Sequence, residues 1–280
     1  MTSNLSGSAS ALPFFVSTSC YTQFSQEKGF TMAELPSSIL GADTNDLLHQ
    51  LQSLCLDAGL TVSDDQLQMC LDHLLLVIEK NKVINLTRIT SIQDALVLHI
   101  LDSLLLLPYV DRAPNGCLLD MGTGAGYPGL PLHIVSGRSS TLLDSVGKKV
   151  HAVQEFTERL HLKNVRPVHS RLEDYARDHR SQYSVVVARA LSSLPVLVEY
   201  AAPFLSHGGL FIAAKARPDL DELRSGDLAA DICGLRRIDT DEFDLPYSLG
   251  HRTVVVFKSV AQPSIKLPRQ SGTAKRSPLA

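Results

Sequence analysis

The chain lacks the cysteine pattern that would build a disulfide framework or a zinc site. Its 280 residues contain five cysteines, an odd number, and none of them forms a CxxC pair. The five are scattered along the chain as Cys20, Cys55, Cys70, Cys117 and Cys233. Isolated thiols of this kind are typical of the reducing cytoplasm, so we expect a cytoplasmic protein that holds no metal.

Long apolar runs are also missing. The densest one, residues 95–110, is interrupted by His99 and Asp102 and falls short of the ~18 apolar residues that a membrane helix needs. No basic segment precedes the mildly apolar residues 11–20, so we expect no signal peptide. The first 44 residues are rich in Ser and Thr and are predicted to be a disordered extension, or to lie outside the natural product if translation starts at Met32.

Acidic residues are absent after Asp244, although the formal net charge of the whole chain is -3. The basic residues of that end are Arg252, Lys258, Lys266, Arg269, Lys275 and Arg276. A basic end on a mildly acidic protein fits a contact with a polyanion, and it fits a solvated tail equally well.

Two kinds of periodicity divide the rest of the chain. Residues 45 to about 108 have apolar residues at helical spacing, with an N-cap at Ser63 and a third helix over 92–107 that should stop at Pro108. Short apolar strands then alternate with helices. The predicted strands are 117–121, 141–143, 165–169, 185–188, 210–214, 234–238 and 253–257, and the predicted helices are 128–135, 148–160, 194–205 and 219–230.

This alternation predicts an α/β fold with a mostly parallel seven-stranded sheet and helices on both faces. Little helix separates the last two strands, so one of them should be antiparallel. We therefore expect an extension (1–44), an N-terminal helical segment (45–110), a core (111–260) and a basic tail (261–280).

The first core strand runs into a glycine-rich turn that can be interpreted in two ways. Gly124, Gly126 and Gly129 form G-x-G-x-x-G, and Asp144 ends the next strand, as in dinucleotide-binding domains. Asp120 also precedes the loop, so that the same stretch reads D-x-G-x-G-x-G. This pattern resembles the first motif of S-adenosylmethionine-dependent methyltransferases, in which the loop wraps the amino-acid and ribose parts of the cofactor. A tight turn without a ligand is the remaining alternative.

No catalytic apparatus accompanies this loop in the sequence. A Ser-His-Asp pattern, a metal-ligand cluster and a Pro-Cys dipeptide are all missing, and the fourth strand ends in Ala188-Arg189-Ala190-Leu191 instead of an Asn/Asp-Pro-Pro-Tyr motif. Methyl transfer needs chiefly alignment of a nucleophile and exclusion of water. The acceptor is therefore expected to need little deprotonation, and N7 of guanine fits because its lone pair is free at neutral pH.

Six blocks, in order along residues 45 to 275, carry a more specific resemblance. They are Asn85-Leu86-Thr87 followed by His99-Ile100-Leu101-Asp102-Ser103, Gly122 to Leu132, Leu142 to Lys149, Ser170-Arg171-Leu172-Glu173, Ala188-Arg189-Ala190, and Leu267-Pro268-Arg269-Gln270-Ser271-Gly272-Thr273. Together they resemble the RsmG family, also called glucose-inhibited division protein B. The resemblance implies methylation of N7 of a guanine in 16S ribosomal RNA of the small subunit, with S-adenosylmethionine as cofactor.

The resemblance also implies site residues. The cofactor-binding residues would be Asp120, Gly122, Gly124, Gly126, Tyr127, Asp144, Leu172, Glu173 and Arg189. The candidate RNA contacts are Lys148, Lys149, Arg171, Lys215, Lys266 and Arg269. No general acid or base is expected, although Arg189 and Lys215 could contribute to transfer, and we expect a monomer without membrane or metal partners.

The chain departs from the family in two places. Many members have Trp-Asn where this chain has Lys80-Asn81, and the chain has no tryptophan; many have Lys-Gly where it has Lys215-Ala216. His99, Asp102 and Ser103 share a helix face and either line the substrate pocket or dock the helical segment on the core. The competing functions are a nicotinamide-dependent oxidoreductase and a ribosome-binding module without turnover.

Overall fold

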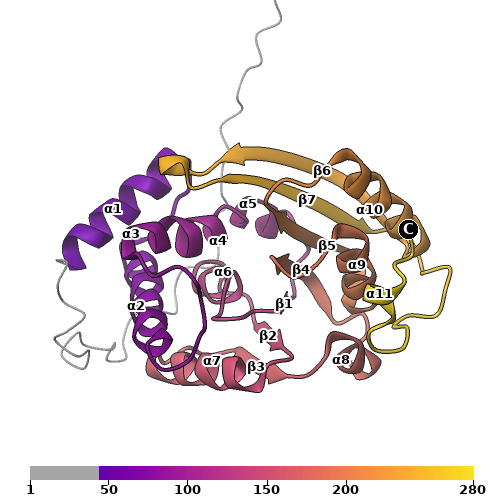
Figure 1. The fold of residues 1–280 in the computed structure, drawn as a ribbon, viewed down its shortest axis with the longest axis horizontal. Helices are drawn as coiled ribbons and strands as arrows, with labels where there is room; N and C mark the ends of the chain where they lie inside the picture. The colour runs from indigo at the N-terminus through magenta and orange to yellow at the C-terminus, as the bar shows by residue number, and fades with distance from the viewer. Residues whose placement is uncertain (1–43) are drawn as a thin grey trace, which may run out of the picture.

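A single mixed sheet organises the protein. The computed structural model describes residues 44–280, so that the extension expected over 1–44 lies almost entirely outside the described residues. Seven strands lie in the order β3-β2-β1-β4-β5-β7-β6 (Figure 1). Their bounds are β1 Cys117–Met121, β2 Ser140–Asp144, β3 Val165–His169, β4 Tyr183–Arg189, β5 Leu205–Lys215, β6 Leu235–Asp244 and β7 His251–Ser259.

The strand directions confirm the predicted mostly parallel sheet. Strands β1 to β5 pair in parallel, whereas β7 is antiparallel to both β5 and β6. The antiparallel strand is therefore the last one, inserted between β5 and β6. A dinucleotide-binding domain instead has the parallel order 3-2-1-4-5-6, so this topology argues against the oxidoreductase interpretation.

Helices cover both faces of the sheet. Alternate strand residues point to opposite sides, and apolar residues on each side are buried under helices. On one face, Leu118, Val185 and Val187 pack with the N-terminal helical segment, α6 and α7. On the other face, Leu119 and Val186 belong to the core beneath α8 to α11. The core helices are α6 Gly129–Ser136, α7 Gly147–Arg159, α8 Leu172–Asp178, α9 Leu194–Ala201, α10 Leu220–Ile232 and α11 Thr273–Arg276. Helices α8 and α11 were not predicted.

The N-terminal helical segment packs on the α6 and α7 side (Figure 1). Its elements are α1 Thr44–Asp57, α2 Asp64–Asn81, α3 Ile92–Ala95, the π-helix Leu96–Leu101, α4 Asp102–Leu104 and α5 Leu107–Asp111. The predicted N-cap is confirmed: Ser63 Oγ accepts from the Gln66 N–H at 3.3 Å, and the Gln66 side chain returns the bond.

The predicted end of the third helix is wrong. Pro108 lies in the first turn of α5, where its missing N–H would have no intrahelical partner anyway, so the chain continues helically to Asp111. The run Ile92–Asp111 is long and apolar enough to cross a membrane by length and composition, but 67% of its most apolar stretch is buried inside the protein. Packing against the core accounts for its apolar character.

Candidate functional site

Three glycines shape the loop that follows β1. Gly122, Gly124 and Gly126 have φ angles of +77°, +60° and +96°, which a side chain would make unfavourable. A Cβ on Gly122 would approach Leu191 to 2.8 Å, whereas one on Gly124 would have no neighbour closer than 4.0 Å. The loop therefore packs tightly at Gly122 and leaves open space at Gly124.

Asp120 joins strand β1 to the start of α6. Its Oδ2 atom accepts a hydrogen bond from the Gly129 N–H at 2.9 Å, and burial raises the pKa of this carboxyl to about 6. A Cβ on Gly129 would lie 2.6 Å from the same oxygen and 2.3 Å from Leu142. The third glycine of the G-x-G-x-x-G pattern therefore serves the close approach of helix and strand.

Asp144 connects the loop to the end of β2. Its Oδ2 atom accepts from the Gly124 N–H at 3.0 Å, and its Oδ1 atom accepts from the Val146 N–H at 2.8 Å. Each carboxylate oxygen has a second lone pair, so Asp144 can accept further hydrogen bonds from a ligand. The two neighbouring strand ends are thereby held in one arrangement.

Leu172 and Glu173 follow β3 and begin α8. Leu172 is buried, and the carboxylate of Glu173 accepts a hydrogen bond from the Gly272 N–H at 2.7 Å. The side chain of Glu173 is therefore engaged by the C-terminal segment. The backbone of this turn is the part that can still face a ligand at the carboxyl edge of the sheet.

Tyr127 points away from the open side of the loop. Its ring stacks on His99 at a centroid distance of 4.5 Å and lies 4.5 Å from the ring of His73. Burial raises the pKa of the Tyr127 hydroxyl well above its ordinary value. The aromatic ring therefore belongs to the contact between the helical segment and the loop, where His73 Nε2 also lies 3.0 Å from the Ala125 carbonyl oxygen.

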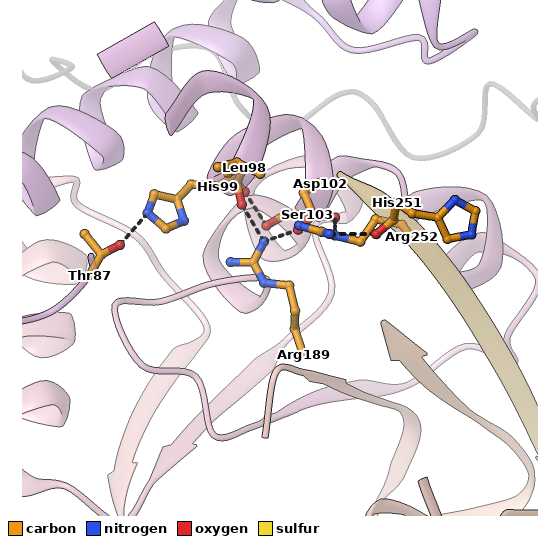
Figure 2. Close-up of polar contacts among 8 residues, drawn as sticks. All are labelled: Thr87, Leu98, His99, Asp102, Ser103, Arg189, His251 and Arg252. Atoms are coloured by element: carbon orange, nitrogen blue, oxygen red, sulfur yellow. Dashed lines mark hydrogen bonds and ion pairs between the residues drawn. The ribbon is translucent and has the colours of Figure 1, made fainter. Parts of the chain in front are cut away.

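Arg189, at the end of β4, forms an ion pair with the helical segment. Its Nη1 atom donates to Asp102 Oδ2 at 2.8 Å and to the Leu98 carbonyl of the π-helix at 2.9 Å. Arg252 of β7 donates to the other Asp102 oxygen at 2.8 Å, so two guanidinium groups converge on one carboxylate (Figure 2). Of the two interpretations of Asp102, the structure supports docking, since the carboxylate is buried between these arginines.

The six candidate RNA contacts differ in their surroundings. Lys148, Lys149 and Arg171 lie at the starts of α7 and α8, at the same sheet edge as the glycine loop. Lys215 is paired with Glu222 at 2.8 Å, and Arg269 is paired with Glu199. Lys266 is exposed, as is Arg171. The structure thus gives two of the six cations a partner within the protein.

Sequence reasoning missed three residues that organise this region. His73 lies within the apolar face of α2, Arg252 was noted only for its charge, and Glu199 lies in a helix that is otherwise apolar. For His73 and Glu199 the available signal was a polar residue inside an apolar pattern, since buried polar groups are nearly always partnered. Arg252 lies between His251 and Thr253 at the start of β7 and gave no such signal.

The residues present fit S-adenosylmethionine. A cofactor with ribose hydroxyls and an ammonium group requires acceptors, and the site supplies the Asp144 carboxylate beside an open glycine backbone. Sheet order, the antiparallel β7 and this loop define the class of S-adenosylmethionine-dependent methyltransferases. Among residues 44–280, no cluster of three or more His, Cys, Asp or Glu could hold a metal ion.

Comparisons with known proteins identify the family. Residues 66–246 match the family GidB, rRNA small subunit methyltransferase G. The chain is 36% identical over 232 residues to Ribosomal RNA small subunit methyltransferase G of Alkaliphilus metalliredigens, covering 82% of this chain and 97% of the relative. It is 38% identical over 224 residues to the protein of the same name from Acetivibrio thermocellus, covering 79% and 92%. The chain therefore belongs to the rRNA small subunit methyltransferase G family.

Among solved structures, the chain is similar to that of M. jannaschii TYW2 in complex with AdoMet. The sequence identity is 21% and the TM-score is 0.43, over 51% of this chain and 68% of that one.

Proposed function

We propose that this protein transfers a methyl group from S-adenosylmethionine to N7 of a guanine in the 16S rRNA of the small ribosomal subunit. The observation that carries the proposal is the Asp144 carboxylate, which accepts the Gly124 N–H at the open end of the glycine loop. Membership of the rRNA small subunit methyltransferase G family supports the same proposal. We further propose that the protein acts in the cytoplasm as a monomer.

The cofactor site would combine backbone and carboxylate groups from three strand ends. Asp144 would accept from the ribose hydroxyls, and the backbone at Leu172 and Glu173 would face the adenine. The loop glycines 122, 124 and 126 would approach the amino-acid part, with Asp120 holding the loop from below. Tyr127 and Arg189 would act from behind this site, since the structure engages their side chains with the helical segment.

The chemistry asks little of the protein beyond alignment. S-adenosylmethionine supplies a methyl group that the sulfonium charge already activates, and N7 of guanine offers a lone pair that carries no proton at neutral pH. The chain therefore has to bind both partners, orient them in line and exclude water. Arg189 and Lys215 would contribute charge near the acceptor only after leaving Asp102 and Glu222.

RNA contacts would begin at the sheet edge that carries the cofactor site. Lys148 and Lys149 lie in the first turn of α7, and Arg171 is the residue just before α8. Cations at this edge would bind phosphates and fix the orientation of the substrate without reading its sequence. Lys266 would be a more distant contact, while Lys215 and Arg269 would have to leave Glu222 and Glu199 to take part.

The test is a methyl-transfer assay with base mapping. Small ribosomal subunits from a strain lacking the modification are incubated with the protein and methyl-labelled S-adenosylmethionine. We expect label on N7 of one guanine of 16S rRNA, and no label with an Asp144→Ala variant that stays folded. Absence of label in the RNA with the native protein would refute the proposal.

A further inference from the structure

The basic C-terminal end is folded against the methyltransferase core. Residues 267–277, here named the C-terminal strap, contain the buried Leu267 and Ala274 and run beside α9 and α8. Figure 1 shows this yellow segment and α11 next to α9. Arg180 donates to the Leu267 carbonyl, which fastens the start of the strap. The basic end is therefore a structural element over most of its length.

One side of the strap is held by a buried ion pair. Arg269 Nε donates to Glu199 Oε1 at 2.7 Å and Nη2 donates to Oε2 at 2.5 Å, a two-bond geometry. Only 3% of the Glu199 side chain is exposed. The hydrogen bond to Glu199 raises the pKa of Arg269 above its ordinary value. Lifting the strap would leave a buried carboxylate without a partner, which is strongly unfavourable.

The other side of the strap contacts the first turn of α8. The Gly272 N–H donates to Glu173 Oε1 at 2.7 Å, and Ser271 Oγ donates to Asp174 Oδ1 at 3.0 Å. Tyr200 of α9 lies close to both acids, since burial and, secondly, the carboxylates of Glu173 and Glu199 raise the pKa of its hydroxyl to about 12. The strap therefore connects the turn after β3 to the rigid, buried α9.

The turn after β3 needs such support. Strand β3 is an edge strand that pairs only with β2 among the described strands, and none of its five residues is fully buried. Helix α8 has only seven residues, too few to be stable without tertiary contacts. The contacts from Ser271 and Gly272 are thus well placed to fix the position of Leu172 and Glu173.

We propose that the C-terminal strap is a positioning element that holds the β3–α8 turn in place, so that Arg269 and Gly272 set the affinity for the adenine end of S-adenosylmethionine. The inference rests on the proposed function, because it assigns that turn to the cofactor. It also assigns Arg269 to cofactor binding through Glu173, in place of direct contact with RNA.

The experiment compares two full-length variants with the native protein. Glu199→Gln/Arg269→Gln removes the ion pair without leaving a lone buried charge, and Lys266→Gln removes an exposed cation just before the strap. We expect the double variant to raise the Kd for S-adenosylmethionine, measured by titration calorimetry, about tenfold. The kcat at saturating cofactor and the KM for small subunits should stay within about twofold. Lys266→Gln should leave the Kd for S-adenosylmethionine unchanged, because this exposed side chain belongs to the candidate RNA contacts and not to the cofactor site.

Three results would overturn the inference: an unchanged Kd in the folded double variant, an equal loss of affinity in Lys266→Gln, or a raised KM for small subunits alone. If the double variant does not fold, hydrogen exchange of the native protein decides. Because coupling between sites is reciprocal, binding of S-adenosylmethionine should slow hydrogen exchange at the Gly272 amide. Unchanged exchange at this amide would refute the positioning role proposed for the strap. Failure of the native protein to bind S-adenosylmethionine would instead refute the proposed function.

Discussion

Arg189 and Asp102 form an ion pair at 2.8 Å although 87 residues separate them in the chain. The pair connects the end of β4 to the helical segment, and Arg252 binds the same carboxylate from β7. Only 2% of the Asp102 side chain is exposed, compared with 14% of Arg189 and 18% of Arg252. One buried carboxylate therefore joins three parts of the fold directly above the carboxyl edge of the sheet.

Replacing Asp102 by Ala should destabilise the protein strongly. The change leaves two guanidinium groups close together with no carboxylate between them, so we expect the free energy of unfolding to fall by about 3 kcal/mol. Urea denaturation at pH 7 measures this loss. Asp57→Ala removes an exposed acid at the end of α1 and should change stability by less than about 0.5 kcal/mol. Equal effects of the two variants would contradict the role assigned to Asp102.

Asp144→Ala should abolish tight cofactor binding while the protein keeps its association with small subunits. The variant loses the acceptor of the Gly124 N–H and the proposed acceptor of the ribose hydroxyls. Loss of two charge-assisted hydrogen bonds corresponds to a rise in Kd of about 100-fold. Calorimetric titration with S-adenosylmethionine gives the Kd, and Ser145→Ala, at the exposed neighbouring position, is the control. Unchanged affinity in Asp144→Ala would place the cofactor elsewhere.

The sheet could be predicted from the sequence because each strand is a short apolar run that ends in a turn signal. The positions of candidate site residues at strand ends, such as Asp144 and Arg189, followed from the same pattern, since parallel strands bring their carboxyl ends to one edge. The predicted antiparallel strand was also confirmed. These features depend on local patterns that a single sequence contains.

Features that depend on distant partners could not be predicted. Helix α8 is short and has no apolar repeat, and it is fastened by a strap almost 100 residues further along the chain. The basic tail fitted a solvated or RNA-bound segment because Glu199, the partner of Arg269, lies 70 residues earlier. The side to which Tyr127 points likewise depends on His73 and His99 from other helices.

Gly129→Ala should disrupt the contact between α6 and β1. The added Cβ would lie 2.3 Å from Leu142 Cδ2 and 2.6 Å from the Asp120 carboxylate, so that the helix or the strand would have to move. We expect a loss of about 3 kcal/mol in the free energy of unfolding, measured by denaturant titration. Gly147→Ala is a matched control, because its Cβ would approach only the His169 side chain, at 3.2 Å. Similar stability of both variants would show that the contact is not rigid.

The buried histidines should make the protein sensitive to mild acid. Burial, with smaller contributions from Arg189 and His73, lowers the pKa of His99 to about 3, so the folded protein keeps this imidazole neutral. The unfolded chain takes up the proton near pH 6.5, which favours unfolding as the pH falls from 6.5 towards 3, by about 1.4 kcal/mol per pH unit below about 6. His99→Phe retains a ring to stack on Tyr127 and removes this titration.

The stability of His99→Phe should therefore decline less steeply between pH 7 and 5 than that of the native protein, by urea denaturation at several pH values. The comparison of the two curves isolates His99, because Asp120 titrates in both proteins and acts in the opposite direction. Burial raises the Asp120 pKa to about 6, so its contribution favours the folded state as the pH falls from 6 towards 4. Parallel curves would show that His99 does not titrate on unfolding.

The rate of methyl transfer should be nearly independent of pH from about 6.5 to 8.5 if N7 of guanine is the acceptor. The N7 lone pair carries no proton in this range, so no residue has to act as a general base, and Asp120 is already mostly ionised above its pKa of about 6. Single-turnover rates on small subunits with saturating S-adenosylmethionine isolate this step from binding. An exocyclic amine or a hydroxyl acceptor would have to lose a proton, and its rate would rise with pH as the base that removes the proton ionises. A steep rise through neutrality would therefore exclude N7, while a flat profile together with label on N7 would show that alignment by the glycine loop and Asp144 suffices for transfer.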